Sequence, residues 1–429
     1  MIVAGMILSF FLLLTILSVP VTTAIAGGAI IGVIVAGFSN ALYIVPQQVL
    51  EGINSSALLA VPFFILAGGL LNKLGMTDRI FNFAEALVGH FRAGLAQVNV
   101  LASLIFAGIS GAAVADCAGL GLVEVKAMRE RGYTPDFAAA VTMASSIVGP
   151  IFPPSIPLVI YAFVSSTSVG RLFLAGIFPA ILIVIGLMAF IWALSIQYNF
   201  PKQPRASIGK ILRTGVDGLV ALVAPAIILA AMVTGFTTAS EAGVIACVYT
   251  LVAGLFYRTL TWRKIWEALT ETTILTSMIL LMLGFSTVMG WVMAIEQVPQ
   301  ALAGAVLTTI DSVWLFLLVY IVFFLVIGCV FDTLAAMIIL MPILLPLIDQ
   351  FGIDRIHFGI VTVFALMIGI LTPPLGIALY IMMDVSHLSF ERLSRAAIPF
   401  LIPLMVVLII LAYFPAISLW LPNLIMGAE

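Results

Sequence analysis

Long runs of apolar residues, separated by short polar segments, follow one another from the first residues of the chain to Trp420. An α-helix needs about 20 apolar residues to cross the hydrocarbon core of a bilayer. The plain runs predict spanning helices at residues 2–18, 21–38, 55–71, 172–196, 219–233, 242–256, 274–295 and 398–419. The pattern therefore predicts an all-α polytopic membrane protein.

Two apolar stretches have the wrong length for plain crossings. Residues 95–123 are too many for one helix and too few for two, and Gly108 to Gly111 interrupt them near the centre. Residues 312–347 form a second such stretch, with Gly328 and Asp332 near its middle. Because irregular backbone at membrane depth is tolerated only where protein or water covers it, we predict a re-entrant helical hairpin in each stretch.

Proline interrupts two further segments, residues 137–165 and 358–383. Pro153, Pro154 and Pro157 fall close together in the first segment, and Pro373-Pro374 interrupts the second. Proline removes a helical hydrogen-bond donor and clashes with a preceding carbonyl group. Both segments are therefore predicted to be broken spanning helices.

The same landmarks occur twice, half a chain apart, which predicts an internal duplication. Asp116, Gly149, Pro153, Pro154 and Arg171 have counterparts 216 to 221 residues later. Those counterparts are Asp332, Gly369, Pro373, Pro374 and Arg392. Each repeat would hold three spans, a re-entrant hairpin, a broken span and a final span.

The distribution of basic residues predicts the orientation of the two repeats. If residues 73–92 are cytoplasmic, 15 of the 17 Lys and Arg residues fall on the cytoplasmic face, and only Arg171 and Arg355 fall outside. Both termini would then face outward and the linker at residues 199–213 would be cytoplasmic. The repeats would be inverted with respect to each other.

Composition excludes several classes of protein. The chain is 63% hydrophobic and 8% charged, whereas a soluble globular protein carries about 25% charged residues. A net charge of −2 and the absence of a basic tail give no indication of a nucleic-acid partner. Cys117, Cys247 and Cys329 lack the spacing of a disulfide or metal site and are expected to be small packing residues.

Inverted repeats with broken helices are typical of secondary transporters, whose sites lie near the bilayer midplane. Each break frees carbonyl groups, which with Ser or Thr hydroxyls suit a small hard cation such as sodium. Two Na⁺ sites are predicted, with candidate ligands at the hairpin tips and the breaks. They are Gly108, Ser110, Gly111, Ser145, Ser146, Gly149 and Pro150 in the first half, and Gly328, Thr333, Gly369, Thr372 and Pro373 in the second. Helix packing explains any one of these small residues better than cation binding does, but packing alone does not require the paired pattern.

Five further positions are candidates for a binding or structural role. Ser155 and Gly376, which follow the breaks, are candidates for contact with substrate. Asp116 and Asp332 lie in apolar surroundings, where acids are functional candidates; each could bind a cation, cap a half-helix or pair with a base. Glu241 is expected to have a structural role, at a helix that begins near Thr238 or Ser240.

Other chemistries have weaker support. The string Gly108-Ile109-Ser110-Gly111 matches the GxSG pattern of intramembrane serine proteases, with Ser110 as nucleophile. However, all three histidines lie at predicted segment edges, away from a midplane serine. No nucleotide-binding P-loop occurs, and no repeated filter sequence or ring of acids indicates a channel.

Four strings resemble the large membrane subunit of the tripartite ATP-independent periplasmic (TRAP) transporters. They are FAGISGAAVAD (106–116), SSIVGPIFPPSIPLVIYA (145–162), GFTTASEAGVIACVY (235–249) and GILTPPLGIALY (369–380). The resemblance implies an ion-transporter-superfamily fold that works as an elevator, and sodium-driven import of an organic acid such as a sialic acid, a sugar acid or a C4-dicarboxylate. It also implies a periplasmic binding protein, a small four-helix membrane subunit, and a multi-pass location in the lipid bilayer of the bacterial inner membrane, without an enzymatic activity.

The elevator implies four parts along the chain. Residues 1–93 and 199–311 would supply the scaffold helices, and residues 94–198 and 312–429 the two halves of the transport domain. Family members often have Ser-Gly-Ser at the first hairpin, where this chain has Ser110-Gly111-Ala112, so its first cation site would depend more on carbonyl groups. No four-span segment precedes residue 1, so we expect the small subunit to be separate. A transporter of the same superfamily that needs no binding protein is the alternative.

Overall fold

The computed structural model describes residues 2–17, 19–38, 41–197, 200, 203–310 and 312–427. Within those ranges every regular element is a helix. Six helices are long and apolar enough to cross a membrane, or up to eight if each of two bent pairs counts as one span. The six are α11, α13, α14, α16, α17 and α20. The prediction of an all-α polytopic membrane protein is confirmed.

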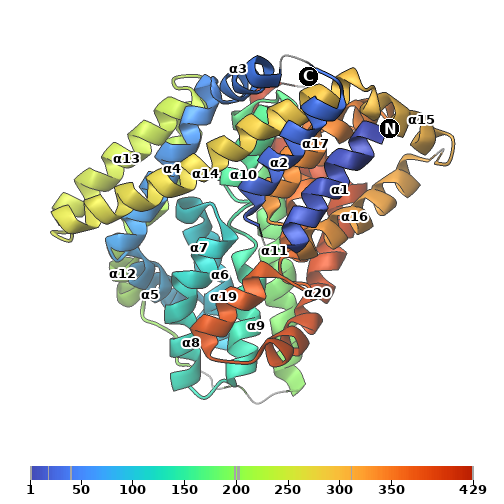
Figure 1. The fold of residues 1–429 in the computed structure, drawn as a ribbon. Helices are drawn as coiled ribbons and strands as arrows, with labels where there is room; N and C mark the ends of the chain where they lie inside the picture. Colours follow the sequence, from blue (N-terminus) through green and yellow to red (C-terminus); the bar gives the residue numbers. More distant parts are fainter. Residues whose placement is uncertain are drawn as a thin grey trace.

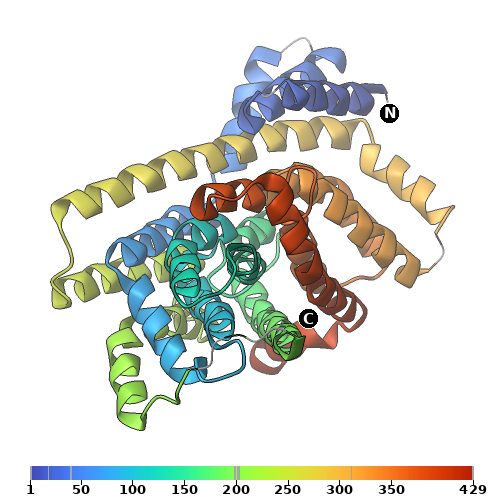
Figure 2. The same ribbon diagram turned by 90° about the horizontal axis from the view of Figure 1, so that it is seen from below.

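We divide the helices by their position in the chain into two groups, the outer group and the inner group, which can be followed by colour in Figures 1 and 2. The outer group contains α1 (Ile2–Ile16), α2 (Val21–Val35), α3 (Ala41–Ile53), the 3₁₀ helix η1 (Ser56–Leu59), α4 (Ala60–Lys73), α5 (Met76–Val88), α12 (Ile208–Val233), α13 (Ala239–Phe256), α14 (Trp262–Ile295) and α15 (Val298–Leu307). The inner group contains α6 (Gly94–Ser110), α7 (Ala113–Ala118), α8 (Leu120–Glu130), α9 (Pro135–Ser146), α10 (Ile156–Ser165), α11 (Val169–Gln197), α16 (Val313–Val330), α17 (Thr333–Gln350), α18 (Arg355–Gly369), α19 (Ile377–Ser386), α20 (Phe390–Tyr413) and α21 (Ala416–Met426).

Helix α14 lies between the N-terminal helices and the inner group (Figure 2). It has 34 residues, so it is about 51 Å long and exceeds the roughly 30 Å of a bilayer core. It packs against α2, α3, α4 and α17. A single long helix thus connects most of the outer group and also contacts the inner group.

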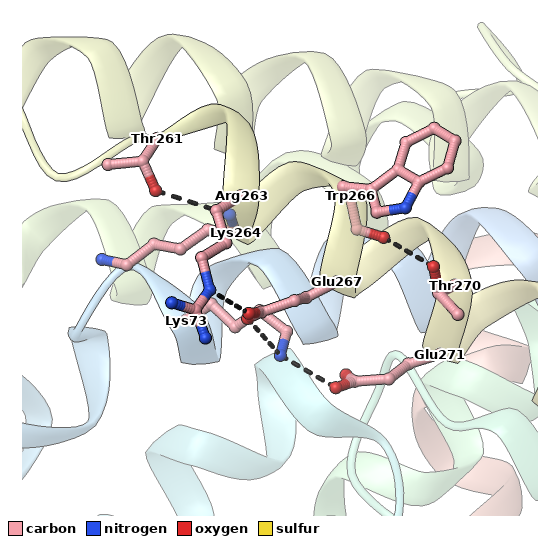
Figure 3. Close-up of polar contacts among 8 residues, drawn as sticks. All are labelled: Lys73, Thr261, Arg263, Lys264, Trp266, Glu267, Thr270 and Glu271. Atoms are coloured by element: carbon pink, nitrogen blue, oxygen red, sulfur yellow. Dashed lines mark hydrogen bonds and ion pairs between the residues drawn. The ribbon is translucent and has the colours of Figure 1, made fainter.

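Charged residues join the start of α14 to the end of α4 (Figure 3). Lys73 Nζ lies 2.9 Å from Glu271 Oε1 and 3.6 Å from Glu267 Oε2. Arg263 Nε donates to Glu267 Oε1 at 2.8 Å, and the Thr261 hydroxyl caps the helix by accepting from the amide of Lys264. These half-exposed pairs orient the two helices and stabilise them weakly.

Helix α18 is the centre of the inner group. Every residue from Ile356 to Gly369 is buried, and α18 packs against α10, α11, α16, α17, α20 and α21. At one end of the group Arg355 pairs with Asp349 and donates to the carbonyl group of Ser165 in α10, both at 2.9 Å. Elsewhere Arg392 of α20 pairs with Asp136 of α9 at 2.7 Å. Helices from the two halves of the chain are thus joined by charged groups as well as by packing.

Both predicted helix breaks are confirmed. The first interrupts the chain between Ser146 and Ile156, and the second between Gly369 and Ile377. The peptide bonds Pro153-Pro154 and Pro373-Pro374 are both cis. Each predicted hairpin stretch contains a turn at its interruption: α6 ends at Ser110, and α16 ends at Val330.

Several predicted boundaries are wrong. Residues 76–88, assigned to a polar segment, form the amphipathic helix α5, whose apolar face packs against α6 and α12 and which bends by 72° from α4. The linker is helical from Ile208 onward, α14 begins twelve residues earlier than predicted, and α3 and α15 were not predicted at all. The last span divides at Phe414, because a residue that precedes proline is disfavoured in a helix. Hydropathy alone finds apolar runs and misses helices that are apolar on one face only.

The structural prediction for Glu241 is confirmed. The hydroxyl of Thr238 accepts from the amide of Glu241 at 3.4 Å, and Glu241 Oε2 accepts from the amide of Thr238 at 2.7 Å. The two residues therefore form a capping box at the start of α13. Both satisfy amide groups that would otherwise have no helical partner.

We predict that Thr238→Ala lowers the stability of the protein by about 1 kcal/mol, because it leaves an amide at the start of α13 without its acceptor. Thr234→Ala is the matched control. Its hydroxyl donates to the carbonyl group of Ala230, which already accepts from an amide. Thermal unfolding of the purified protein in detergent measures both. Equal shifts in the two variants would contradict a capping role.

Candidate functional site

The first hairpin tip lies directly against the first helix break. Gly111 has a left-handed backbone with φ 60°, and a Cβ there would come within 2.6 Å of the carbonyl oxygen of Pro154. The amide of Ile156 donates to the carbonyl oxygen of Gly111 at 3.4 Å. A Cβ on Gly149 would lie 3.4 Å from the carbonyl carbon of Ala112. Backbone therefore meets backbone here, and only glycine permits the approach at position 111.

The second hairpin tip meets the second break even more closely. A Cβ on Gly369 would lie 2.5 Å from the carbonyl carbon of Gly328. The amide of Gly376, the N-cap of α19, donates to the carbonyl oxygen of Cys329 at 3.1 Å. Thr372 turns its hydroxyl back to the carbonyl oxygen of Ile368 at 2.9 Å. The structure thus brings the predicted residues of each half together at one hairpin and one break.

One buried hydroxyl near each meeting point has no hydrogen-bond partner. Among the described residues, neither Ser110 Oγ nor Thr333 Oγ1 makes a hydrogen bond. Ser110 is the last residue of α6, and Thr333 is the first of α17. A buried hydroxyl without a partner is unfavourable, so these two oxygen atoms are free to coordinate a ligand.

Other predicted ligands already have contacts within the protein. The Ser145 hydroxyl accepts from Ser103 at 2.9 Å and donates to Asn99 at 2.8 Å, and Ser146 donates to the carbonyl oxygen of Met143. The absent side chain of Gly108 makes room for Pro225 of α12. These residues support helix packing, which was the alternative role considered for each.

Asn99 and Ser103 were missed by the sequence analysis, although they are functional-site neighbours. Asn99 donates to the hydroxyl of Thr142 at 2.6 Å, so a buried hydrogen-bond network joins α6 to α9 just before the break. Polar residues within the apolar stretch 95–123 were the available signal. Their roles depend on α9, which the sequence cannot place beside them.

The two candidate substrate residues have partners of their own. Ser155 is the N-cap of α10: its hydroxyl donates to the carbonyl oxygen of Pro150 and accepts from the amide of Leu158 at 3.2 Å. Pro150 is therefore held through its carbonyl group, and Gly376 through its amide. A role in substrate binding stays a prediction for both residues.

The two acids aligned by the sequence occupy different local positions. Asp332 caps α17 by accepting from the amide of Leu334 at 2.9 Å. Asp116 is the fourth residue of α7, whose N-cap is Ala112, so the capping role is wrong for Asp116. Neither carboxylate oxygen of Asp116 accepts a hydrogen bond from an amide of the described residues. The two acids are equivalent in sequence spacing, but only Asp332 caps a helix.

A second buried acid lies near Asp116. Both Asp116 and Glu124 of α8 are buried, and none of their four carboxylate oxygens makes a hydrogen bond to the described part of the protein. Glu124 was missed because it lies just beyond the apolar stretch 95–123 and two residues before Lys126. Throughout the described ranges, no three His, Cys, Asp or Glu residues gather in a way that could hold a metal ion.

The two breaks differ in exposure. Residues 147–155 are almost entirely buried, whereas Pro374 and Leu375 of the second break are exposed. The half-helices that follow the breaks contact the hairpins of the opposite half of the chain: α10 packs against α17, and α19 packs against α7 and α8. Each half-helix that follows a break thus rests on the hairpin of the other half.

No base for a nucleophilic serine is present at Ser110, since its hydroxyl has no partner among the described residues. His357 instead bonds to Ser418 and to the carbonyl oxygen of Ala412 near the end of α20. His387 is the C-cap of α19. The geometry gives no support to proteolysis.

Residues 7–417 match the sequence model of the family described as "Tripartite ATP-independent periplasmic transporter, DctM component". The chain is 43% identical over 390 residues to the sialic acid TRAP transporter large permease protein SiaM of Vibrio cholerae, covering 91% of each chain. It is 37% identical to the C4-dicarboxylate TRAP transporter large permease protein DctM of Pseudomonas aeruginosa, over 85% of this chain and 86% of that one. In fold it is similar to the YdaH transporter of Alcanivorax borkumensis, with a TM-score of 0.58 over 90% of each chain at 15% identity.

We predict that Gly369→Ala lowers stability by about 1–3 kcal/mol, because its Cβ would collide with the backbone of Gly328, which cannot move like a flexible side chain. Gly149→Ala is the control in the other half. Its Cβ would meet its nearest neighbours at 3.3 Å or more, so its effect should stay below about 1 kcal/mol. Thermal unfolding in detergent compares them, and a larger loss in the Gly149 variant would contradict the geometry.

Proposed function

As a member of the DctM-component family of tripartite ATP-independent periplasmic transporters, this chain is a large permease subunit, and we propose that it imports an organic acid by sodium symport. The family consists of transporter permeases and not of enzymes. It works with a small membrane subunit and a periplasmic binding protein. We place this chain in the bacterial inner membrane as a multi-pass protein with both termini in the periplasm.

The proposed substrate class is a carboxylate. Similar permeases are named for sialic acid and for C4-dicarboxylates, which share a carboxylate group and little else. In this proposal the binding protein chooses the acid and the permease supplies the path. The amide groups at the starts of α10 and α19, beside Ser155 and Gly376, would attract the carboxylate.

Sodium is proposed as the coupling substrate at two places. The residues fit this ion, because each meeting of hairpin and break offers carbonyl groups and one buried hydroxyl without a partner, Ser110 or Thr333. This pairing is the observation on which the proposal depends. The other proposed ligands are those of the sequence analysis: Gly108, Gly111, Ser145, Ser146, Gly149 and Pro150 at the first site, and Gly328, Gly369, Thr372 and Pro373 at the second.

We propose an elevator built from inverted repeats. The scaffold would comprise residues 1–93 and 199–311, and the transport domain residues 94–198 and 312–429. Support comes from the packing of each half-helix on the opposite hairpin and from the charged contacts of Arg355 and Arg392, which join the two halves of the inner group. The long helix α14 would be the surface along which the transport domain moves.

Reconstitution in proteoliposomes tests the whole proposal. The permease, with a small subunit and a purified binding protein loaded with radiolabelled sialic acid or succinate, should take up substrate only under an inward sodium gradient. Uptake that proceeds without a binding protein would favour the alternative, a self-sufficient transporter of the same superfamily. Uptake that is indifferent to sodium would contradict symport.

We predict that Ser110→Ala and Thr333→Val each raise the sodium concentration for half-maximal uptake several-fold while membrane insertion stays normal. Each change removes one oxygen ligand and leaves the carbonyl groups in place. Thr276→Val is the control, because Thr276 also carries a buried hydroxyl without a described partner but lies in α14, which contributes no proposed ligand. Uptake at varied sodium measures the three variants; an unchanged sodium dependence in both site variants would refute the ligand assignment.

A further inference from the structure

A proline in α17 leaves one carbonyl group without its helical donor. Pro342 has no amide hydrogen, so it cannot donate to the carbonyl oxygen of Ile338 four residues earlier. Ile338 is 1% exposed, so water does not replace the missing donor. In apolar surroundings such a group is strongly unfavourable unless another part of the protein satisfies it.

A side chain of the outer group supplies the donor. Ser286 of α14 is buried, and its hydroxyl donates to the carbonyl oxygen of Ile338 at 2.6 Å. One turn further along α14, Gly290 faces the proline ring, because a Cβ on Gly290 would lie 3.7 Å from Cβ of Pro342. At the interrupted turn of α17, helix α14 thus supplies a hydroxyl donor and, one turn later, a glycine that leaves room for the proline ring.

The neighbouring residue shows that this arrangement is not the default for a hydroxyl in a helix. Thr287 donates to the carbonyl oxygen of Leu283 in its own helix at 3.0 Å, as Ser and Thr residues within helices commonly do. That carbonyl group also has the helical amide of Thr287 as a donor. Ser286 therefore supplies a hydrogen-bond donor that the opposite helix lacks, whereas the carbonyl group bonded by Thr287 already has a helical donor.

From these contacts we infer that Ser286 is a positioning residue for transport, which holds the second hairpin at the observed position along α14. The inference rests on the proposed function, in which α17 moves with the transport domain and α14 belongs to the scaffold. A slide of even one helical turn, about 5.4 Å, separates the hydroxyl from the carbonyl group of Ile338. The observed position is the one in which this carbonyl group has a donor.

Pro342 provides a direct test, because Pro342→Ala restores an amide donor to Ile338. In that background the hydroxyl of Ser286 is no longer needed. The four proteins of the cycle are the wild type, Ser286→Ala, Pro342→Ala and the double variant, each assembled with the small subunit. Spin labels at Arg258 and Glu391, which are exposed in the outer and inner groups, report the distance between the groups, and the three native cysteines are buried.

Ser286→Ala should shift the population away from the observed position by about threefold, and by no more than about twentyfold, the range measured for hydrogen bonds between membrane helices. The same change in the Pro342→Ala background should shift it by less than about 1.5-fold. Ser286→Thr, which keeps the hydroxyl, should resemble the wild type. Thr287→Val, which removes the neighbouring hydroxyl, should also leave the distribution unchanged. Elution as a single peak in size-exclusion chromatography confirms that each variant is folded.

The outcomes separate this inference from the elevator itself. Two label distances in the wild type, with an effect of Ser286→Ala that disappears in the Pro342→Ala background, support the inference. If two label distances are seen and Ser286→Ala shifts the population equally in the wild-type and Pro342→Ala backgrounds, the inference is overturned and the elevator is left intact. A single distance in every variant, together with sodium-dependent uptake, overturns the elevator and the inference together.

Discussion

Every backbone polar group in the apolar interior of this protein needs a hydrogen-bond partner from the protein itself. Prolines remove helical hydrogen-bond donors at both breaks. A hairpin tip lies against each break. The amide of Ile156 donates to the carbonyl oxygen of Gly111, and the amide of Gly376 donates to the carbonyl oxygen of Cys329. The glycines at these contacts are there because backbone must touch backbone. The arrangement of the inner group follows from this requirement.

The same requirement also produces oxygen atoms that can bind a cation. Proline contributes a carbonyl oxygen but no amide donor, and among the described residues the buried hydroxyls of Ser110 and Thr333 have no hydrogen-bond partner. Ser145, Ser146 and Ser155 each donate a hydrogen bond within the protein, so they also stabilise the walls of the candidate site. A small cation suits such a place, because it needs oxygen atoms and tolerates backbone and side-chain sources equally.

The contact between the outer and inner groups obeys the same rule with a different consequence. Where Pro342 interrupts α17, the missing donor comes from Ser286 on α14, and so from the other group. A partner within one group makes that group rigid. A hydrogen bond between the outer and inner groups favours one relative position of the two groups. Such a bond must break if the groups move relative to each other.

The sequence by itself determined the features that depend on covalent structure alone. A proline lacks an amide hydrogen in any surroundings, so the breaks at Pro153-Pro154 and Pro373-Pro374 could be placed, and long apolar runs identified most of the spanning helices. The tertiary structure decided which groups meet. Asp116 and Asp332 look alike in sequence, but only Asp332 stands at the start of a helix and caps it. The buried Glu124, the network of Asn99 and the donor for Ile338 were likewise beyond prediction, because each depends on a neighbour distant in the chain, and local patterns carry no information on which helices lie side by side.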